Sequence, residues 1–383
     1  MNSSAPKTLR LRLRPTAESI VRSGHPWVFA DSIKEQNRDG AADEFAIIFD
    51  RNDKFLAIGF YDPDSPIRVR VLHVGKPIQI DATFWKGRFE AALAKRAALF
   101  DAETTGYRCI HGENDGFPGL VLDRYGVTFV LKIYTAAWFS RIHDLLPLIN
   151  GERVVLRLSR TLKGLDGKTL VGTLPAGPVL FLENGARFEA DVLRGQKTGF
   201  FLDQRENRKT VGTLSAGRDV LNAFSFSGGF SVYAARGGAR SVSDLDISAH
   251  ALASAKRNFS HNQLTTIHET IQADTFEFLG RKPDRRFGLI VLDPPSLAKR
   301  ASEKPGALRA YRKLAQSALP WLDRNGILVA ASCSAHVTPE EFFSTILEAT
   351  RPAGLKEFGR TKNPSDHPAT FPEAHYLKCI YLR

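Results

Sequence analysis

One stretch of the chain, residues 218–246, constrains the fold more than any other. Residues 220–224 form a short apolar run, which is typical of a strand buried in a parallel sheet. A glycine pair follows, residues 230–236 have the apolar spacing of a short helix, and residues 242–245 predict a second strand. Asp246 ends this second strand. The stretch therefore predicts a strand–helix–strand unit of a Rossmann-like α/β sheet.

A unit of this kind is suited to bind a nucleoside. Its turn lies at the carboxyl end of the first strand, where open α/β sheets bind ligands. Asp246 follows the turn by roughly 20 residues, the spacing at which a carboxylate holds ribose hydroxyls. The turn reads SFSGGF rather than GxGxxG, so a ligand with a ribose and no phosphates fits better. We predict S-adenosylmethionine as this ligand; the alternative is an ordinary unit with a solvated Asp246.

Composition limits the classes of protein to consider. A chain of 383 residues predicts two or three domains. Its net charge of +12 favours a polyanionic partner such as RNA. The three cysteines are far apart, which indicates a reducing cytoplasm and no close-spaced zinc motif. No apolar run approaches the roughly 20 residues of a membrane span, so we expect no membrane association.

Residues 1–75 predict a small β-rich domain. Arg10, Arg12 and Arg14 alternate with leucines, the pattern of a half-buried strand with a cationic outer face. Trp27, in the segment HPWVF, adds an aromatic surface. Basic side chains beside aromatic ones can contact phosphates and stack on bases, so these four residues are candidate RNA contacts. The alternative is a small barrel with a charged exterior and with Trp27 and Phe29 in its core.

Residues 76–190 predict a mixed α/β middle module. His111, Glu113 and Asp115 are metal-ligand types within one turn, but a surface turn is the interpretation we favour, and we predict no metal. The expected elements are a helix over 83–100, a hairpin strand over 127–134, a helix over 138–149, a strand over 153–158, a loop or linker over 159–178 and a strand over 181–192.

Residues 191–383 continue the α/β alternation and hold further donor-binding candidates. Lys197 or Arg205 is placed by sequence to meet the carboxylate of a bound amino-acid moiety; the alternative is a solvated, charged helix. Asp274 follows a strand and either contacts an adenine amino group or caps the next helix. Apolar runs at 287–292 and 326–331 predict the fourth and fifth strands.

Asp293 and Cys333 follow these two strands. In a doubly wound sheet the fourth strand lies beside the first and the fifth beside the fourth, so both residues are expected at the donor crevice. Asp293 begins a stiff Asp-Pro-Pro loop suited to contact a planar base. Lys299 and Arg300 open a basic segment after this loop and are candidate RNA contacts.

A cysteine at this position suggests a specific reaction. Carbon 5 of cytosine is a weak nucleophile until a thiolate adds to carbon 6, so Cys333 is a candidate for covalent catalysis. Asp293 is placed to bond the ring-nitrogen and amino edge of the base. A free thiol ionises at about pH 8.5, and the basic segment would favour the thiolate. The alternative is a buried, structural strand-end cysteine.

Several longer motifs occur together: HPWVF, GENDGFPGLVLDRYG, QKTGFFLDQRENR, NAFSFSGGF, LDPPSLAK, SCS and DHPATFPEAHYLK. With them the chain resembles, nearly end to end, the ribosomal RNA large subunit methyltransferase I family. The resemblance implies a PUA RNA-binding domain, a middle module and a class I S-adenosylmethionine-dependent methyltransferase that forms 5-methylcytosine. It implies Cys333 as nucleophile, and the full set of expected donor contacts is Lys197, Arg205, Asn222, Ser225, Gly228, Asp246, Asp274 and Asp293.

The sequence therefore predicts an enzyme that methylates cytosine in large-subunit rRNA, with domains over residues 1–75, 76–190 and 191–383. Two alternatives stay open. An RNA N-methyltransferase would use the Asp-Pro-Pro loop without a cysteine nucleophile, and a non-catalytic RNA-binding or assembly factor would need neither group. A homodimer is also compatible with the sequence.

Overall fold

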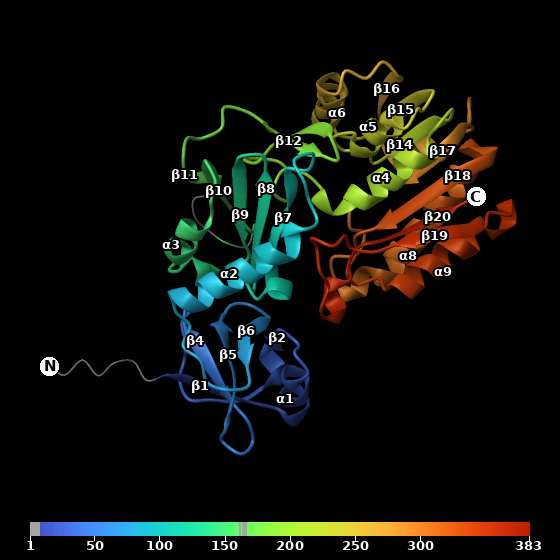
Figure 1. The fold of residues 1–383 in the computed structure, drawn as a ribbon. Helices are drawn as coiled ribbons and strands as arrows, with labels where there is room; N and C mark the ends of the chain where they lie inside the picture. Colours follow the sequence, from blue (N-terminus) through green and yellow to red (C-terminus); the bar gives the residue numbers. More distant parts are fainter. Residues whose placement is uncertain (1–7, 161, 163–166) are drawn as a thin grey trace. The chain divides into compact units, whose positions relative to one another are not determined.

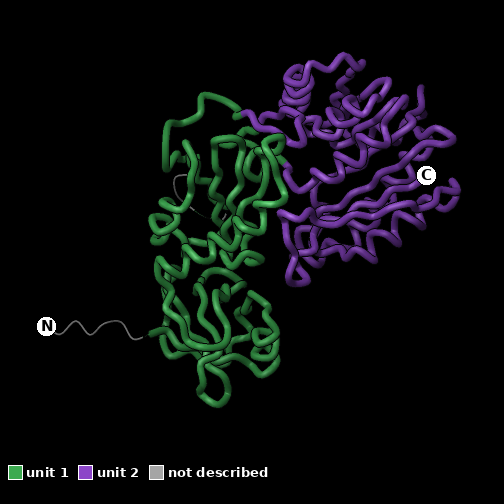
Figure 2. The backbone as a smooth tube through the Cα atoms, in the orientation of Figure 1, with its two compact units in different colours: residues 1–179, 190–200 green, residues 180–189, 201–383 purple. Residues whose placement is uncertain are grey.

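The computed structural model describes residues 8–160, 162 and 167–383, which form two compact units (Figures 1 and 2). Unit 1 lies within residues 1–179 and 190–200, and unit 2 comprises residues 180–189 and 201–383. Part of the predicted linker over 159–178, namely residues 161 and 163–166, lies outside the described residues. The three-domain division drawn from the sequence stays a prediction.

Unit 1 begins with a six-stranded sheet in the order β2-β6-β5-β4-β1-β3. The leucines of its first strand are buried and the arginines between them are exposed or half-buried, as the alternating pattern predicts. A short helix, which the sequence analysis did not predict, follows this strand. The elements are β1 (Leu9–Leu13), α1 (Pro15–Arg22), β2 (Trp27–Phe29), β3 (Ile33–Gln36), β4 (Phe45–Phe49), β5 (Phe55–Tyr61) and β6 (Ile67–Val74).

A five-stranded sheet in the order β11-β10-β9-β8-β7 completes unit 1. The two sheets share one apolar core, in which the Phe60 and Trp138 ring centroids are 5.1 Å apart and those of Trp85 and Trp138 are 5.0 Å apart. Unit 1 is therefore one packed body. Its elements are α2 (Ala82–Ala97), β7 (Gly106–His111), β8 (Leu120–Tyr125), β9 (Thr128–Ile133), α3 (Ile142–Leu145), β10 (Arg153–Leu158) and β11 (Lys168–Val171).

Three predictions for the middle of the chain are wrong. The helix expected over 138–149 is interrupted, and only α3 is α-helical; it does not continue past Leu145, because Pro147 cannot donate a backbone hydrogen bond. The loop expected over 159–178 contains β11, which pairs with β10. The single strand expected over 181–192 is a hairpin of β12 (Val179–Glu183) and β13 (Ala186–Ala190), turned at Asn184-Gly185 with φ of 48° and 72°.

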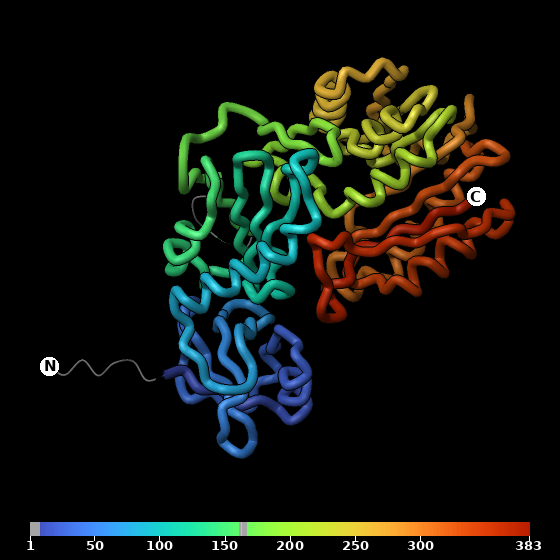
Figure 3. Tube along the Cα trace, in the orientation of Figure 1, coloured from blue at the N-terminus to red at the C-terminus, as the bar shows by residue number. Residues whose placement is uncertain are grey.

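Unit 2 is built on a seven-stranded sheet in the order β16-β15-β14-β17-β18-β20-β19; Figure 3 traces the path of the chain through this unit, which ends in red. The first five strands are parallel, and β20 is antiparallel to both of its neighbours. The predicted placement of the fourth strand beside the first, and the fifth beside the fourth, is confirmed. The strands are β14 (Asp219–Ala223), β15 (Ser241–Asp246), β16 (Ile267–Gln272), β17 (Phe287–Leu292), β18 (Leu322–Ser332), β19 (Glu357–Thr361) and β20 (Lys378–Leu382).

Two layers of helices cover this sheet (Figure 1). One layer contains α4 (Arg205–Leu214), α5 (Gly229–Arg236) and α6 (Ala249–His261); the other contains α7 (Thr275–Leu279), α8 (Lys304–Ala318) and α9 (Pro339–Thr350). Leu221 and Ala223 of β14 belong to the apolar core with α7, α8 and α9. Because side chains alternate along a strand, Asn222 faces the α5 layer.

Among the residues that the structure describes, no helix combines the length and the apolar character needed to cross a membrane.

Candidate active site

Three segments of unit 2 meet at the carboxyl end of the sheet. They follow the neighbouring strands β14, β17 and β18. Ala223 pairs with Leu292, and Leu292 pairs with Ala330, so these strands end close to the same level. The backbone N–H of Asp293 extends the ladder by donating to the Ala223 carbonyl at 3.4 Å. The turn after β14, Asp293 and the Cys333 segment therefore line one edge of the sheet.

The turn after β14 is held in an unusual conformation. Phe224, Phe226 and Gly228 have φ of 60°, 48° and 72°, the left-handed region that side chains with a Cβ seldom occupy. Two oxygens of one carboxylate fix the turn: Asp246 Oδ2 accepts from the Phe226 N–H at 2.9 Å, and Oδ1 accepts from the Ser248 N–H at 2.8 Å. The strand-end aspartate thus shapes the loop in addition to any contact with a ribose.

Polar atoms inside this turn show whether a donor molecule would fit. Ser225 and Ser227 are 5% and 4% exposed, and among the described residues no group bonds to the Oγ of either. Buried hydroxyls in proteins are almost always hydrogen-bonded, so this pair indicates a site for a polar ligand. The turn also needs its glycine, because a Cβ on Gly228 would lie 2.8 Å from the Ala255 Cβ of α6. Ser225, Ser227 and Asp246 are thus suited to hold S-adenosylmethionine.

Asn222, expected at the donor, lies in a buried network beneath the turn. It is 0% exposed, and its Nδ2 donates to Asp244 Oδ1 at 2.9 Å and to Ser231 Oγ at 3.0 Å. Asp244 Oδ2 in turn bonds His268 Nε2 at 2.7 Å. Because Asn222 faces α5, the network fixes that helix on the sheet. A direct contact of Asn222 with the donor stays a prediction.

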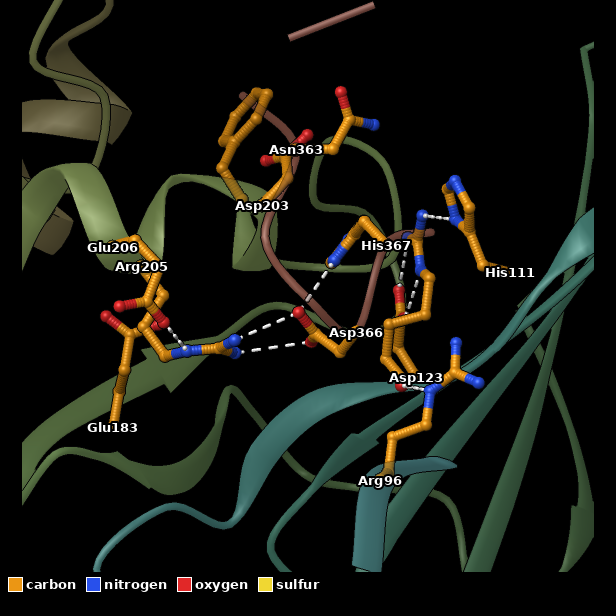
Figure 4. Close-up of polar contacts among 12 residues, drawn as sticks. Arg96, His111, Asp123, Glu183, Asp203, Arg205, Glu206, Asn363, Asp366 and His367 are labelled. Atoms are coloured by element: carbon orange, nitrogen blue, oxygen red, sulfur yellow. Dashed lines mark hydrogen bonds and ion pairs between the residues drawn. The ribbon is translucent and has the colours of Figure 1, made fainter. Parts of the chain in front are cut away.

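Arg205, also expected at the donor carboxylate, is paired with a carboxylate of the chain itself (Figure 4). Its Nη2 lies 2.9 Å from Asp366 Oδ1 and its Nη1 lies 3.2 Å from Oδ2, and both side chains are buried. Burial acts to raise the pKa of Asp366, but the neighbouring His367 and Arg205 outweigh it and hold this pKa well below its usual range. Arg205 therefore anchors the segment that contains Asp366.

Two further donor candidates have other contacts. Lys197 belongs to unit 1, where its carbonyl accepts a hydrogen bond from Lys132 Nζ at 2.8 Å. Asp274 caps α7, because its Oδ1 accepts from the Glu277 N–H at 3.0 Å, which is the helix-cap alternative raised from the sequence. The donor roles of both residues stay predictions.

Asp293 is oriented by a residue that the sequence analysis did not single out. Gln204 Nε2 donates to Asp293 Oδ1 at 2.8 Å, and Asn207 Nδ2 donates to Gln204 Oε1. Tyr381 holds Asn207 by donating to its Oδ1 at 3.0 Å. This chain of bonds turns the Gln204 amide nitrogen toward Asp293, whose Oδ1 accepts the hydrogen bond. The available signal was the DQREN segment, with two amides spaced i,i+3 at the start of α4.

Cys333 lies between two fully buried serines. Ser332 and Ser334 are both 0% exposed, and the Tyr311 hydroxyl contacts their Oγ atoms at 2.8 and 3.0 Å, whereas Cys333 is half-buried. Ser334 Oγ also accepts from the Leu297 N–H at 3.0 Å. The serines therefore join the cysteine segment to the loop after Asp293. By contrast, Cys109 and Cys379 are 1% and 0% exposed, and burial raises the pKa of Cys379 to about 12.

The RNA-contact candidates are divided between the two units. In unit 1, Arg10 and Arg12 lie 3.4 and 2.8 Å from Asp53 Oδ1 and line a pocket of about 500 Å³. Arg14 Nε donates to the Asp31 carbonyl at 2.8 Å, and Trp27 Nε1 donates to Glu113 Oε1 at 2.9 Å. In unit 2, Lys299 and Arg300 are exposed on the segment before α8.

The turn of residues 111–115 is not the surface turn that we favoured. Asp115 is buried and pairs with Arg96 at 2.7 Å and with Lys95 at 2.9 Å, while Glu113 pairs with Arg70 at 2.8 Å. Burial acts to raise the pKa of Asp115, but hydrogen bonding to Arg96 lowers it overall. Within residues 8–160, 162 and 167–383, no group of three or more His, Cys, Asp or Glu side chains is arranged to hold a metal.

The topology of unit 2 and its turn after β14 define a class I S-adenosylmethionine-binding domain. A family model described as S-adenosylmethionine-dependent methyltransferase matches residues 168–383, and a PUA-like domain model matches residues 11–73. A solved Streptococcus mutans protein assigned to the SAM-dependent methyltransferases has the same fold, with a TM-score of 0.85, 24% identity and coverage of 97% of this chain and 99% of that one. A second solved structure, described as a methyltransferase complexed with SAH, has a TM-score of 0.86 at 24% identity and the same coverage.

Curated relatives match along the whole chain. A protein of Deinococcus radiodurans named "Ribosomal RNA large subunit methyltransferase" is 54% identical over 402 residues, covering 100% of this chain and 98% of its own. "Ribosomal RNA large subunit methyltransferase I" of Shewanella frigidimarina is 35% identical over 394 residues, covering 98% and 99%. The chain therefore belongs to the ribosomal RNA large subunit methyltransferase family of S-adenosylmethionine-dependent enzymes. S-adenosylmethionine is accordingly its cofactor.

Proposed function

We propose that this enzyme methylates carbon 5 of a cytosine in large-subunit rRNA and that Cys333 is the nucleophile. The observation that carries the proposal is the position of Cys333 and Asp293 at the carboxyl ends of the adjacent strands β18 and β17, next to the turn after β14. A base placed at this edge would have a thiol, a carboxylate and the turn after β14 as neighbours. The names of the relatives, which are ribosomal RNA methyltransferases, support rRNA as the substrate.

The residues of the chain would divide the chemistry between them. Bound S-adenosylmethionine supplies an electrophilic methyl group. The Cys333 thiolate would add to carbon 6 of the base, which makes carbon 5 a nucleophile able to accept this methyl group. Loss of the carbon-5 proton to solvent would then re-form the double bond between carbons 5 and 6 and expel the thiolate. Asp293, oriented by Gln204, would bond the ring-nitrogen and amino edge of cytosine. The target base must be unpaired or flipped to reach these groups.

We also propose which residues contact rRNA and the donor, where the enzyme acts and how its chain is divided and assembled. The PUA-like domain and the basic segment at Lys299 and Arg300 would contact rRNA, and the enzyme would act in the cytoplasm, where the ribosome is assembled. The donor would be held by the turn after β14 and by Asp246, with Lys197, Arg205, Asn222 and Asp274 as further candidates. The division at residues 75 and 190 and a homodimer are likewise proposed.

Nucleoside mass spectrometry tests the reaction directly. Large-subunit rRNA is incubated with S-adenosylmethionine and with wild-type protein, Cys333→Ala or Cys109→Ala. New 5-methylcytidine with wild type and Cys109→Ala, and none with Cys333→Ala, is the expected result. Product formed by Cys333→Ala, or a methylated amino group, would replace the covalent mechanism by N-methylation. Absence of S-adenosylmethionine binding in calorimetry would favour an assembly factor.

A further inference from the structure

A lysine that the proposed reaction does not use is buried next to the Cys333 segment. Lys378 is the first residue of β20 and pairs with Ser332, the residue before Cys333. It is 1% exposed. A lysine is almost never this deeply buried without a function or a specific set of partners, because removing an ammonium from water is costly.

The ammonium of Lys378 donates hydrogen bonds to backbone carbonyls near the cysteine. Its Nζ donates to the Ser334 carbonyl at 2.6 Å, to the Val337 carbonyl at 2.6 Å and to the Tyr376 carbonyl at 3.1 Å. Three acceptors use all three N–H groups of an ammonium. In the described part of the chain, no carboxylate forms an ion pair with Nζ, so the positive charge is bonded to dipoles only.

Charged and titratable groups surround Cys333 on several elements. Besides the effect of burial, a negative charge on Cys333 acts to raise the pKa of Lys378 of β20 and that of Tyr311 of α8. Asp293 after β17 also acts to raise the pKa of this tyrosine. Glu340 and Glu341 of α9 also act electrostatically to raise the pKa of Lys378. Burial lowers the pKa of Lys378 to about 8, so the side chain still carries its proton at neutral pH.

We propose that Lys378 is the positioning residue of Cys333: it fixes the segment from Ser334 to Val337 and stabilises the cysteine as a thiolate. The thiol proton passes to solvent, and the resulting negative charge is stabilised by a cation that forms no ion pair with a carboxylate of the described residues. The inference deepens the proposed function and rests on it for its purpose, since a thiolate is the form of cysteine that attacks carbon 6.

Alkylation of the thiol in the full-length protein tests this inference without RNA or S-adenosylmethionine. Cys109 and Cys379 are buried, so iodoacetamide is expected to modify only Cys333 in the folded chain, and mass spectrometry follows its rate against pH. The variants are Lys378→Gln, which keeps an amide donor and removes the charge, and Lys378→Arg, which keeps the charge. Lys256→Gln, at an exposed lysine of α6, is the control for loss of one positive charge.

The expected result separates charge from structure. Lys378→Gln should raise the pH of half-maximal alkylation by at least about one unit, which lowers the rate at pH 7 about tenfold. Lys378→Arg and Lys256→Gln should stay close to wild type. Equal midpoints in wild type and Lys378→Gln, or equal shifts in Lys378→Gln and Lys378→Arg, would overturn the inference.

A second measurement covers the case in which Lys378→Gln does not fold. Electrostatic coupling is reciprocal, so the near-isosteric Cys333→Ser should lower the titration midpoint of the Lys378 ammonium, followed by NMR of labelled lysine side chains. An unchanged midpoint would contradict the inference. Because neither measurement requires turnover, an active Cys333→Ala enzyme would remove the covalent mechanism and leave the coupling between Lys378 and the thiol intact.

Discussion

At the scale of single residues, Asp246 holds the turn after β14 in place. Its two oxygens accept from the Phe226 and Ser248 N–H groups at 2.9 and 2.8 Å. Asp246→Ala should weaken S-adenosylmethionine binding about 10- to 100-fold, because a hydrogen bond to a charged acceptor contributes about 1.5–3 kcal/mol. Isothermal titration calorimetry measures the change. Asp219→Ala, at the amino end of β14, is the control, and wild-type affinity in Asp246→Ala would refute the assignment.

Lys378 also predicts a pH dependence of stability. Burial lowers its pKa from 10.5 to about 8, so between these pH values the unfolded chain keeps a proton that the folded chain has released. Raising the pH through this window therefore increases the contribution of Lys378 to the free energy of unfolding. Relative to Lys378→Met, wild type should gain stability from pH 8 to pH 10.5 in urea titrations. Parallel pH profiles of the two proteins would contradict this.

The sequence predicted where the principal candidate site residues lie, which is at strand ends. Asp246, Asp293 and Cys333 each follow an apolar run, and parallel strands bring such positions to one edge. Gln204 could not be found in this way, because its partner Asp293 is 89 residues away and only the fold brings the two together. The pairing of Arg205 with Asp366 could not be foreseen for the same reason, since Asp366 lies 161 residues further along.

At the scale of elements, apolar runs predicted the buried strands well. The predictions failed where a turn reverses the chain within an apolar pattern. The run of β17 is apolar throughout because helices cover both faces of the sheet, so it was recognised without ambiguity. A single strand was predicted in place of the hairpin of β12 and β13, because apolar residues occur on both sides of Asn184-Gly185. The Asn-Gly pair itself is a strong hairpin signal. Alternation therefore found strands but not where they reverse.

A buried ion pair fixes this hairpin to α4. Arg208 Nη2 lies 2.6 Å from Glu183 Oε2, and the two side chains are 3% and 0% exposed. Arg208→Met should lower the free energy of unfolding by about 3–5 kcal/mol, because Glu183 would remain buried without its counter-charge. Urea unfolding measures the loss.

Two further variants test the cause of that loss. The double variant Glu183→Leu/Arg208→Met should recover most of the stability, because an apolar pair of similar volume needs no counter-charge. Arg240→Met breaks the largely exposed pair with Asp219 and should cost much less stability than Arg208→Met. A double variant as unstable as Arg208→Met alone would show that packing, rather than the unpaired carboxylate, causes the loss.

At the scale of the whole molecule, the net charge of +12 is the property through which rRNA would first be attracted. The basic residues proposed to contact RNA differ in whether a carboxylate of the chain already lies beside them. Asp53 lies 2.8 Å from Arg12 and 3.4 Å from Arg10, so phosphates would compete with this carboxylate. Lys299 and Arg300 are exposed on a segment whose one acid, Glu303, accepts a backbone N–H with its carboxylate.

This difference predicts unequal effects on RNA binding. The double variant Lys299→Gln/Arg300→Gln should flatten the dependence of log affinity on log salt by about 1.4–1.8, since each phosphate contact contributes about 0.7–0.9 to the slope. Arg10→Gln/Arg12→Gln should flatten it less, because Asp53 offsets part of the charge lost. Fluorescence anisotropy with a large-subunit rRNA fragment, from about 50 to 300 mM salt, measures both slopes. A larger effect of the Arg10/Arg12 pair would instead mark the first sheet of unit 1 as the main site of phosphate contact.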